Sequence, residues 1–200
     1  DVTCSDDLSS EHLSMAIDAA MMELQGTKGW FHDLKQSSGY TTPKSVFSCT
    51  PDPDLWEYPA ADAAEGLLKR VLDSGELKVA GVQWSTTSGA ADYKTDGENP
   101  TGYWPQYLKE IVGKLSAHYG KEIKIVRKYE VDSVKVVKAV ANGDADMSEP
   151  YYYLNGFFED KPRIESLAFS CVTSGTASVF FTKADSGITT TDELYDAIVA

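Results

Sequence analysis

The chain has 200 residues, 42% of them hydrophobic and 11% aromatic, enough to bury a core in one domain or two small ones. Its formal net charge of −13 would repel nucleic acid and anionic membrane surfaces, so we expect neither as a partner. No run of about eighteen apolar residues occurs, so we expect no direct membrane insertion. The chain opens on DVTCSDDLSS, which does not look like a signal peptide, so an exported protein would appear here in a mature or excised form.

The first predicted helix covers residues 11–25, where apolar side chains recur at helical spacing and Ser9 or Ser10 can cap the start. Glycines end this helix, and the short aromatic-bearing stretch GWFHDLKQ follows. Residues 36–59 contain four prolines and many hydroxyl groups, a composition typical of a linker.

From residue 60 onward, helices alternate with strands. Helices are predicted at 60–74, 104–120 and 131–143, and strands at 77–82, 122–129, 144–148, 166–172 and 176–182. This alternation predicts an α/β fold with a mostly parallel sheet flanked by helices. Ligands of such sheets sit at the carboxyl ends of the strands. Those ends are expected at Gln83-Trp84, Tyr129-Glu130 and Ser148-Glu149.

Cysteine and histidine are sparse and scattered, so we expect no metal site, and no phosphate loop or dinucleotide fingerprint indicates a cofactor. In an oxidising compartment a Cys4–Cys49 disulfide is plausible, and closing that loop would stabilise the fold by roughly 4 kcal/mol. Cys171 lies in the apolar run LAFSCV and is expected to be a buried free thiol.

Several sequence segments resemble a known family when they are taken in order. They are GELKVAGV, TGYWPQYLKEIVGKL, VVKAVANGDADM, PRIESLAFS, TSGTASVFFTK and TTTDELYDAIVA. Their order and spacing, over about residues 64 to 200, resemble the extracellular solute-binding proteins that capture amino acids and similar polar solutes for import. The resemblance implies a lobe like those of type II periplasmic binding proteins, in which a ligand is clamped between two α/β lobes joined by hinge strands.

The amino-terminal stretch SMAIDAAMMELQGTKGWFHDLKQSSG resembles the helices that come last in an intact member of this family. Their position at the start of this chain implies a permuted protein, or the tail of one tandem repeat followed by the first lobe of the next. A chance amphipathic helix is the alternative. The expected organisation is a helical segment at 1–35, a linker at 36–59, the first lobe at 60–190 and the start of a second lobe or hinge at 191–200.

Arg163 is the strongest site candidate, because it matches the family's arginine that pairs with the α-carboxylate of the ligand. A planar guanidinium holds a carboxylate with two parallel hydrogen bonds. An ion pair with Asp160 or Glu165 is the structural alternative. Trp84 stands where the family places an aromatic platform, although a tryptophan in the lobe core is equally consistent, and Gln83 can bond the ligand or face solvent.

The stretch from 148 to 160 is longer and more aromatic than the family pattern. Ser148, Glu149 and Tyr151 can line the cleft, with Glu149 binding a ligand ammonium, and Tyr129 is a further cleft candidate. The aromatic residues of this stretch are also typical of a docking surface. Asp144 and Asp146 are expected in a solvated turn rather than as an acid–base pair.

The expected function is therefore a non-catalytic solute-binding module, secreted or periplasmic, that captures a small carboxylate-bearing solute such as an amino acid. A second lobe or a partner chain would complete the cleft. Three alternatives stay open: a degenerate lobe that serves as a scaffold or interaction module, an enzyme resembling cyclohexadienyl dehydratases, and the ligand-binding domain of a receptor.

Overall fold

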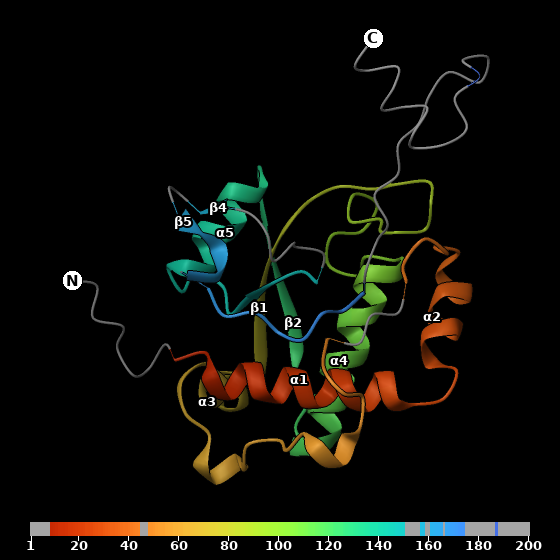
Figure 1. The fold of residues 1–200 in the computed structure, drawn as a ribbon. Helices are drawn as coiled ribbons and strands as arrows, with labels where there is room; N and C mark the ends of the chain where they lie inside the picture. The colour runs from red at the N-terminus through yellow and green to blue at the C-terminus, as the bar shows by residue number, and fades with distance from the viewer. Residues whose placement is uncertain are drawn as a thin grey trace.

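The computed structural model describes residues 9–44, 48–150, 157–158, 161–165, 167–174 and 187, and shows an α/β fold with helices on both faces of an open sheet (Figure 1). The sheet has the order β2-β1-β3, and all three strands are parallel. Its strands are β1 (Glu76–Val82), β2 (Lys124–Glu130) and β3 (Met147–Ser148). This architecture confirms the predicted fold class and is consistent with a lobe of the periplasmic-binding-protein type.

The long pairing in the sheet joins β1 to β2 along their whole lengths, from Glu76 opposite Lys124 to Val82 opposite Glu130. The short strand β3 pairs with the other edge of β1, where Val79 lies opposite Met147. Parallel neighbours need crossover connections. Here the crossovers are α4 (Tyr103–Tyr119) and α5 (Ser133–Ala141).

The side chains of the crossover helices explain where these helices lie. Apolar residues at helical spacing line one face of α4, which is buried in the main core. The helix ends before Gly120, whose φ of 61° is a left-handed conformation that favours glycine. The helix α5 begins at a cap in which the Asp132 side chain accepts a hydrogen bond from the Lys135 backbone N–H at 2.8 Å.

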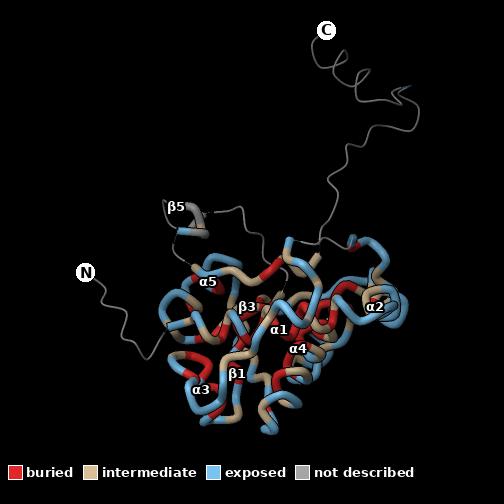
Figure 2. Tube along the Cα trace, turned by 60° about the horizontal axis from the view of Figure 1, so that its bottom comes forward, coloured by how far each residue is buried: buried red, intermediate tan, exposed pale blue. Residues whose placement is uncertain are grey.

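The helices before the sheet pack onto the lobe and share its core (Figure 1). Figure 2 shows buried residues gathered along α1, α4 and β1. The helix α1 contacts both α3 and α4, and Trp30 of α2 meets Tyr107 of α4 at a ring-centroid distance of 5.0 Å. These helices are α1 (Glu11–Gly26), α2 (Trp30–Ser38) and α3 (Gly66–Ser74). Among the described helices, none is long and apolar enough to cross a membrane.

Residues 48–59, predicted as part of a linker, are held against the body of the protein. The Tyr58 hydroxyl donates to Glu23 Oε2 at 3.0 Å, and its ring stacks on His118 at 3.9 Å. The Tyr119 hydroxyl donates to the Pro59 carbonyl at 3.0 Å. Two short 3-10 turns interrupt the connection, η2 (Pro53–Leu55) and η3 (Ala61–Ala63).

Cys49 forms a disulfide with Cys171, across a sequence separation of 122 residues. The expectations of a Cys4–Cys49 bridge and of a free thiol at Cys171 are therefore wrong, and Cys4 itself lies outside the described residues. The pairing follows from the docking of α1. The Cys171 backbone N–H donates to Asp18 Oδ1 on α1 at 2.7 Å, and the Val172 N–H donates to Ser48 Oγ at 2.8 Å.

Three predicted elements differ from the structure, and the strand expected at 144–148 is reduced to Met147–Ser148. The helix expected at 60–74 begins only at Gly66, because that residue has a φ of 54° and its α-carbon lies so close to the Ser9 carbonyl that a β-carbon would clash at 2.2 Å. The strand expected at 166–172 is absent from its described residues, which are irregular. Backbone N–H groups there bond to Asp18 and Ser48 side chains instead of to a neighbouring strand. The strand expected at 176–182 lies outside the described residues.

The segment between β3 and the irregular stretch contains two short strands that were not expected. β4 (Phe157–Phe158) and β5 (Lys161–Pro162) pair antiparallel. They lead directly into η4 (Arg163–Glu165), a 3-10 turn, and the Leu167 N–H after it donates to the Arg163 carbonyl at 2.9 Å. This turn sets the position of Arg163 beside the end of the sheet.

Candidate functional site

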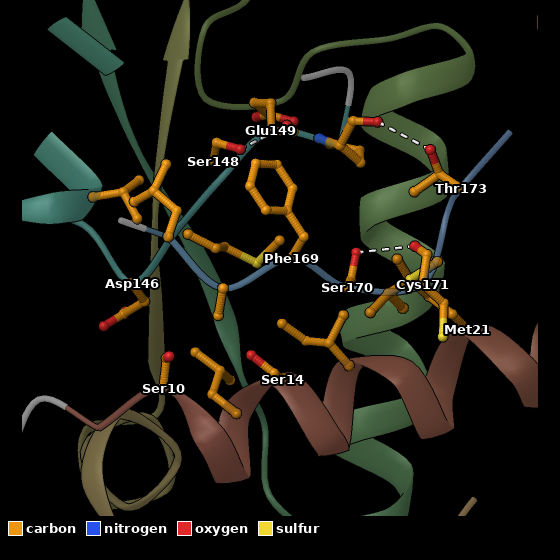
Figure 3. Close-up of a pocket in the computed structure, with 18 of the residues that line it drawn as sticks. Ser10, Ser14, Met21, Asp146, Ser148, Glu149, Phe169, Ser170, Cys171 and Thr173 are labelled. Atoms are coloured by element: carbon orange, nitrogen blue, oxygen red, sulfur yellow. Dashed lines mark hydrogen bonds between the residues drawn. The ribbon is translucent and has the colours of Figure 1, made fainter. Parts of the chain in front are cut away.

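A cavity of about 450 Å³ lies along β3, at the edge of the described sheet (Figure 3). Its floor is one face of α1, from Ser10 to Met21, and α5 contributes aliphatic side chains on another side. The segment 167–174 forms the opposite wall. In Figure 3, Phe169 of this segment stands between α1 and the end of β3.

Hydrogen bonds fix the wall segment to three separate elements. The Thr173 hydroxyl donates to the Pro150 carbonyl at 3.3 Å, and the Tyr107 hydroxyl of α4 donates to the Thr173 carbonyl at 3.3 Å. The Cys171 N–H bond to Asp18 adds the contact to α1. Together with the disulfide to Cys49, these bonds hold the cavity wall in place.

Glu149 follows β3 and is 1% exposed. Its Oε1 accepts a hydrogen bond from Arg127 Nε at 2.7 Å, and its Oε2 accepts one from the Tyr93 hydroxyl at 3.0 Å. Burial raises the pKa of Glu149, and the Arg127 guanidinium and the Tyr93 hydroxyl offset only part of that rise. The ligand-ammonium role expected for Glu149 therefore competes with an internal arginine that already holds the carboxylate.

Asp146 precedes β3 and is also buried, at 5% exposure. Its Oδ2 accepts a hydrogen bond from the Lys78 backbone N–H at 2.7 Å, and its Oδ1 pairs with Arg70 of α3. The expectation of a solvated turn is wrong for Asp146, because the backbone pairing of β3 with β1 places its side chain under the sheet, where Arg70 reaches it. Asp144 is exposed and lies 3.6 Å from Lys128 Nζ.

The predicted site residues fall into two groups. Ser148, Glu149 and Arg163 all line the cavity. Tyr151 lies outside the described residues. The lining of this cavity does not include Gln83, Trp84 or Tyr129.

The second group surrounds Tyr93 at the carboxyl ends of β1 and β2. The rings of Trp84 and Tyr129 lie 5.9 Å and 6.0 Å from the Tyr93 ring. Gln83 Nε2 donates to the Tyr93 carbonyl at 3.1 Å, and the Tyr129 hydroxyl donates to the Gly97 carbonyl at 2.6 Å. These contacts fasten the 85–101 loop to the sheet. Because Tyr93 also bonds Glu149, the two groups share one hydrogen-bonded connection.

Two residues of this network, Tyr93 and Arg127, were missed in the sequence. Each residue is unusual in its segment. Tyr93 is an aromatic residue in a mostly polar loop, and Arg127 is a charged residue directly after the apolar residues of the predicted strand EIKIVRKY. Neither signal points to the other residue. Their meeting at Glu149 depends on the pairing of β1 with both β2 and β3.

The comparisons agree with the architecture. The parallel sheet and its flanking helices define an α/β lobe consistent with the periplasmic-binding-protein type. One solved structure that shares the fold is that of Pf3D7_0606800 (PfVFT1) from Plasmodium falciparum, with a TM-score of 0.61 and 19% sequence identity. The alignment covers 78% of this chain and 55% of that chain, so this chain spans little more than half of that structure. At this identity the likeness shows the fold alone. No family model and no curated protein sequence matches.

Proposed function

We propose that this chain is the first lobe of a non-catalytic solute-binding protein and that the cavity beside β3 receives a small carboxylate-bearing solute. The single observation that carries the proposal is the presence of Arg163 in the lining of a 450 Å³ cavity that runs along β3 and includes Ser148 and Glu149 at its carboxyl end. Ligands of open parallel sheets bind at that edge, and cavities of this size suit small molecules.

Arg163 is the one basic side chain among the described lining residues. It is half-buried, so water screens its charge only in part. A guanidinium that bonds a carboxylate does so through charge-assisted hydrogen bonds, the stronger kind. In this proposal Arg163 anchors the carboxylate, and Ser148 at the end of β3 lies within the same lining.

The group around Tyr93 has a different part in the proposal. Trp84 and Tyr129 are both half-buried, so each ring presents part of its surface at the same edge of the sheet. A second lobe, or a partner chain that supplies one, would close over this edge and over the cavity. Binding by this lobe alone is expected to be weak, with a Kd on the order of millimolar, because closure would bury much of the ligand.

The proposal also places the protein outside the cytoplasm, in a secreted or periplasmic setting. The disulfide between Cys49 and Cys171 supports this, because disulfides form and persist in oxidising compartments.

Ligand-observed NMR on the whole chain tests the proposal, with a panel of small carboxylates that includes amino acids and their deaminated analogues. Arg163→Gln should weaken binding by roughly tenfold or more, since hydrogen bonds to charged groups contribute about 1.5–3 kcal/mol. Lys161→Gln is the matched control, because it removes the same charge from an exposed neighbour. Equal binding by Arg163→Gln and the wild type, or no binding by any member of the panel, would overturn the proposal.

A further inference from the structure

The cavity along β3 borders both apolar clusters of the described residues. The main cluster joins α1, α3, α4 and one face of β1, and it reaches the cavity through Leu13, Ile17 and Met21 of α1. The smaller cluster joins α5 to the other face of β1, and Val140, which packs against it, lines another side of the cavity. Burial of apolar surface favours binding, so the cavity can take the apolar body of a solute between the two clusters.

Phe169 of the wall segment is the one aromatic side chain among the described lining residues. It is half-buried, and it is not among the described side chains that pack against either apolar cluster. Figure 3 shows its ring between Ser14 of α1 and Ser148 at the end of β3. Because neither cluster holds the ring, its apolar surface belongs to the cavity rather than to the core of the protein.

The backbone is fastened on both sides of Phe169. Two residues before it, the Leu167 N–H donates to the Arg163 carbonyl at 2.9 Å. Two residues after it, Cys171 forms the disulfide with Cys49, and the Cys171 N–H donates to Asp18 Oδ1 at 2.7 Å. A side chain carried between two fixed points keeps its place when a solute enters, as a preorganised binding site requires. The ring therefore sets a limit on the room in the cavity.

We propose that Phe169 is the residue that determines the size of the apolar body of the solute. This rests on the proposed function and adds a specificity-determining residue to the same cavity. In a cavity of about 450 Å³, the ring occupies space that a bulkier body would need, and it offers an apolar surface to a body that fits. One methylene more or less in an apolar site changes discrimination by about 10–200-fold, so a single ring can separate solutes of similar size.

Two acids with the same charged group and different bodies, 3-methylbutanoate and 3-phenylpropanoate, test the inference. Competition NMR on the whole chain measures the ratio of their dissociation constants. Phe169→Ala should shift this ratio in favour of the larger acid by at least about tenfold, because the missing ring leaves room for its body. Phe169→Trp should shift the ratio in the opposite direction, because a larger ring takes room away. A general loss of stability would weaken the binding of both acids alike and leave the ratio unchanged.

Phe31→Ala is the matched control and should leave the ratio unchanged, because Phe31 is also half-buried but lies on α2, outside the cavity lining. A ratio that neither Phe169 variant changes, that both variants shift in the same direction, or that Phe31→Ala shifts equally would overturn the inference and leave the proposed function standing. Binding of other carboxylates but of neither acid of this pair would do the same. If the wild type bound no carboxylate at all, the proposed function would fall, and the inference with it.

Discussion

Two acid–arginine pairs stand at the two ends of the short strand β3, and they differ in how much water reaches them. At the start of the strand, Asp146 pairs with Arg70, whose side chain is 32% exposed. At the end, Glu149 pairs with Arg127, whose side chain is only 7% exposed. The backbone N–H of each acid also bonds to β1, at Lys78 and Ala80. The same chemical pair therefore fixes both ends of β3, once near solvent and once inside the protein.

The difference shows what each pair contributes. A buried ion pair adds little net stability, because desolvation offsets its attraction, but removing one partner leaves a buried charge and is costly. Both carboxylates are 1% exposed, but Arg70 lies at the surface, so its removal would let water reach Asp146 and should destabilise the protein less. The inner pair also connects the cavity to the Tyr93 loop, so its loss would affect both groups of candidate site residues.

The largest effect is expected for Arg127→Met, which leaves Glu149 buried without its cation. We expect the free energy of unfolding to fall by about 3–5 kcal/mol, measured by urea denaturation. The double variant Arg127→Met/Glu149→Leu should recover most of that loss, because an apolar pair of similar volume removes the unpaired charge. If Arg127→Met were as stable as the wild type, water would have to reach the Glu149 carboxylate, and the inner pair would not be buried as described.

Arg70→Met should have a smaller effect, of about 1–3 kcal/mol, because Asp146 keeps its hydrogen bond from the Lys78 N–H. The same urea titration measures it. A loss equal to or larger than that of Arg127→Met would contradict the ranking of the two pairs.

Tyr93→Phe removes the second donor to Glu149 and keeps the aromatic contacts with Trp84 and Tyr129. We expect a loss of about 1 kcal/mol, the usual contribution of one hydrogen bond. Gln83→Ala, which removes a donor to the Tyr93 carbonyl on an exposed side chain, is a matched control with an expected change near zero. Equal losses in both variants would mean that the Tyr93–Glu149 bond has no special role.

Asp18 extends the comparison to a carboxylate whose partner is a backbone amide rather than an arginine. Burial raises its pKa to about 6, although the hydrogen bond from the Cys171 N–H opposes that rise. Because the folded-state pKa is raised, the protonated form favours folding. That contribution is complete below about pH 4 and is lost as the pH rises through about 6.

Asp18→Asn keeps an oxygen for the Cys171 N–H and removes the charge. The variant should therefore be more stable than the wild type near neutral pH, by under about 1 kcal/mol after allowance for the partial exposure of this group. The difference should disappear at about pH 4, where the wild-type carboxyl is protonated in the folded state. Urea midpoints of the two proteins across this pH range measure it. A difference that is independent of pH would contradict the raised pKa.

The sequence predicted the local and periodic features of the fold well. The α/β class and the helices at 11–25, 104–120 and 131–143 are confirmed to within a few residues, because each depends on spacing within one segment. The disulfide partner of Cys49 was mispredicted, since Cys171 is brought to it by contacts with segments distant in the sequence, among them α1 and Ser48. The burial of Asp146 was missed for the same kind of reason, because its arginine comes from α3.

The candidate site was foreseeable only in part. Strand ends pointed to Ser148 and Glu149, and the family resemblance pointed to Arg163, and all three line one cavity. The placement of Trp84 and Tyr129 around Tyr93 depends on how the 85–101 loop folds back onto the sheet. No residue type or spacing within that loop predicts this contact. Tertiary pairing between distant segments is the information that a single sequence does not display.

The cross-link between Cys49 and Cys171 encloses most of the lobe in a single covalent ring. If a protease cut the backbone once at any point inside that ring, the two pieces would still travel as one molecule. Cleaved and uncut chains would then have almost the same mass and migrate together on a denaturing gel, until a reductant separated the fragments.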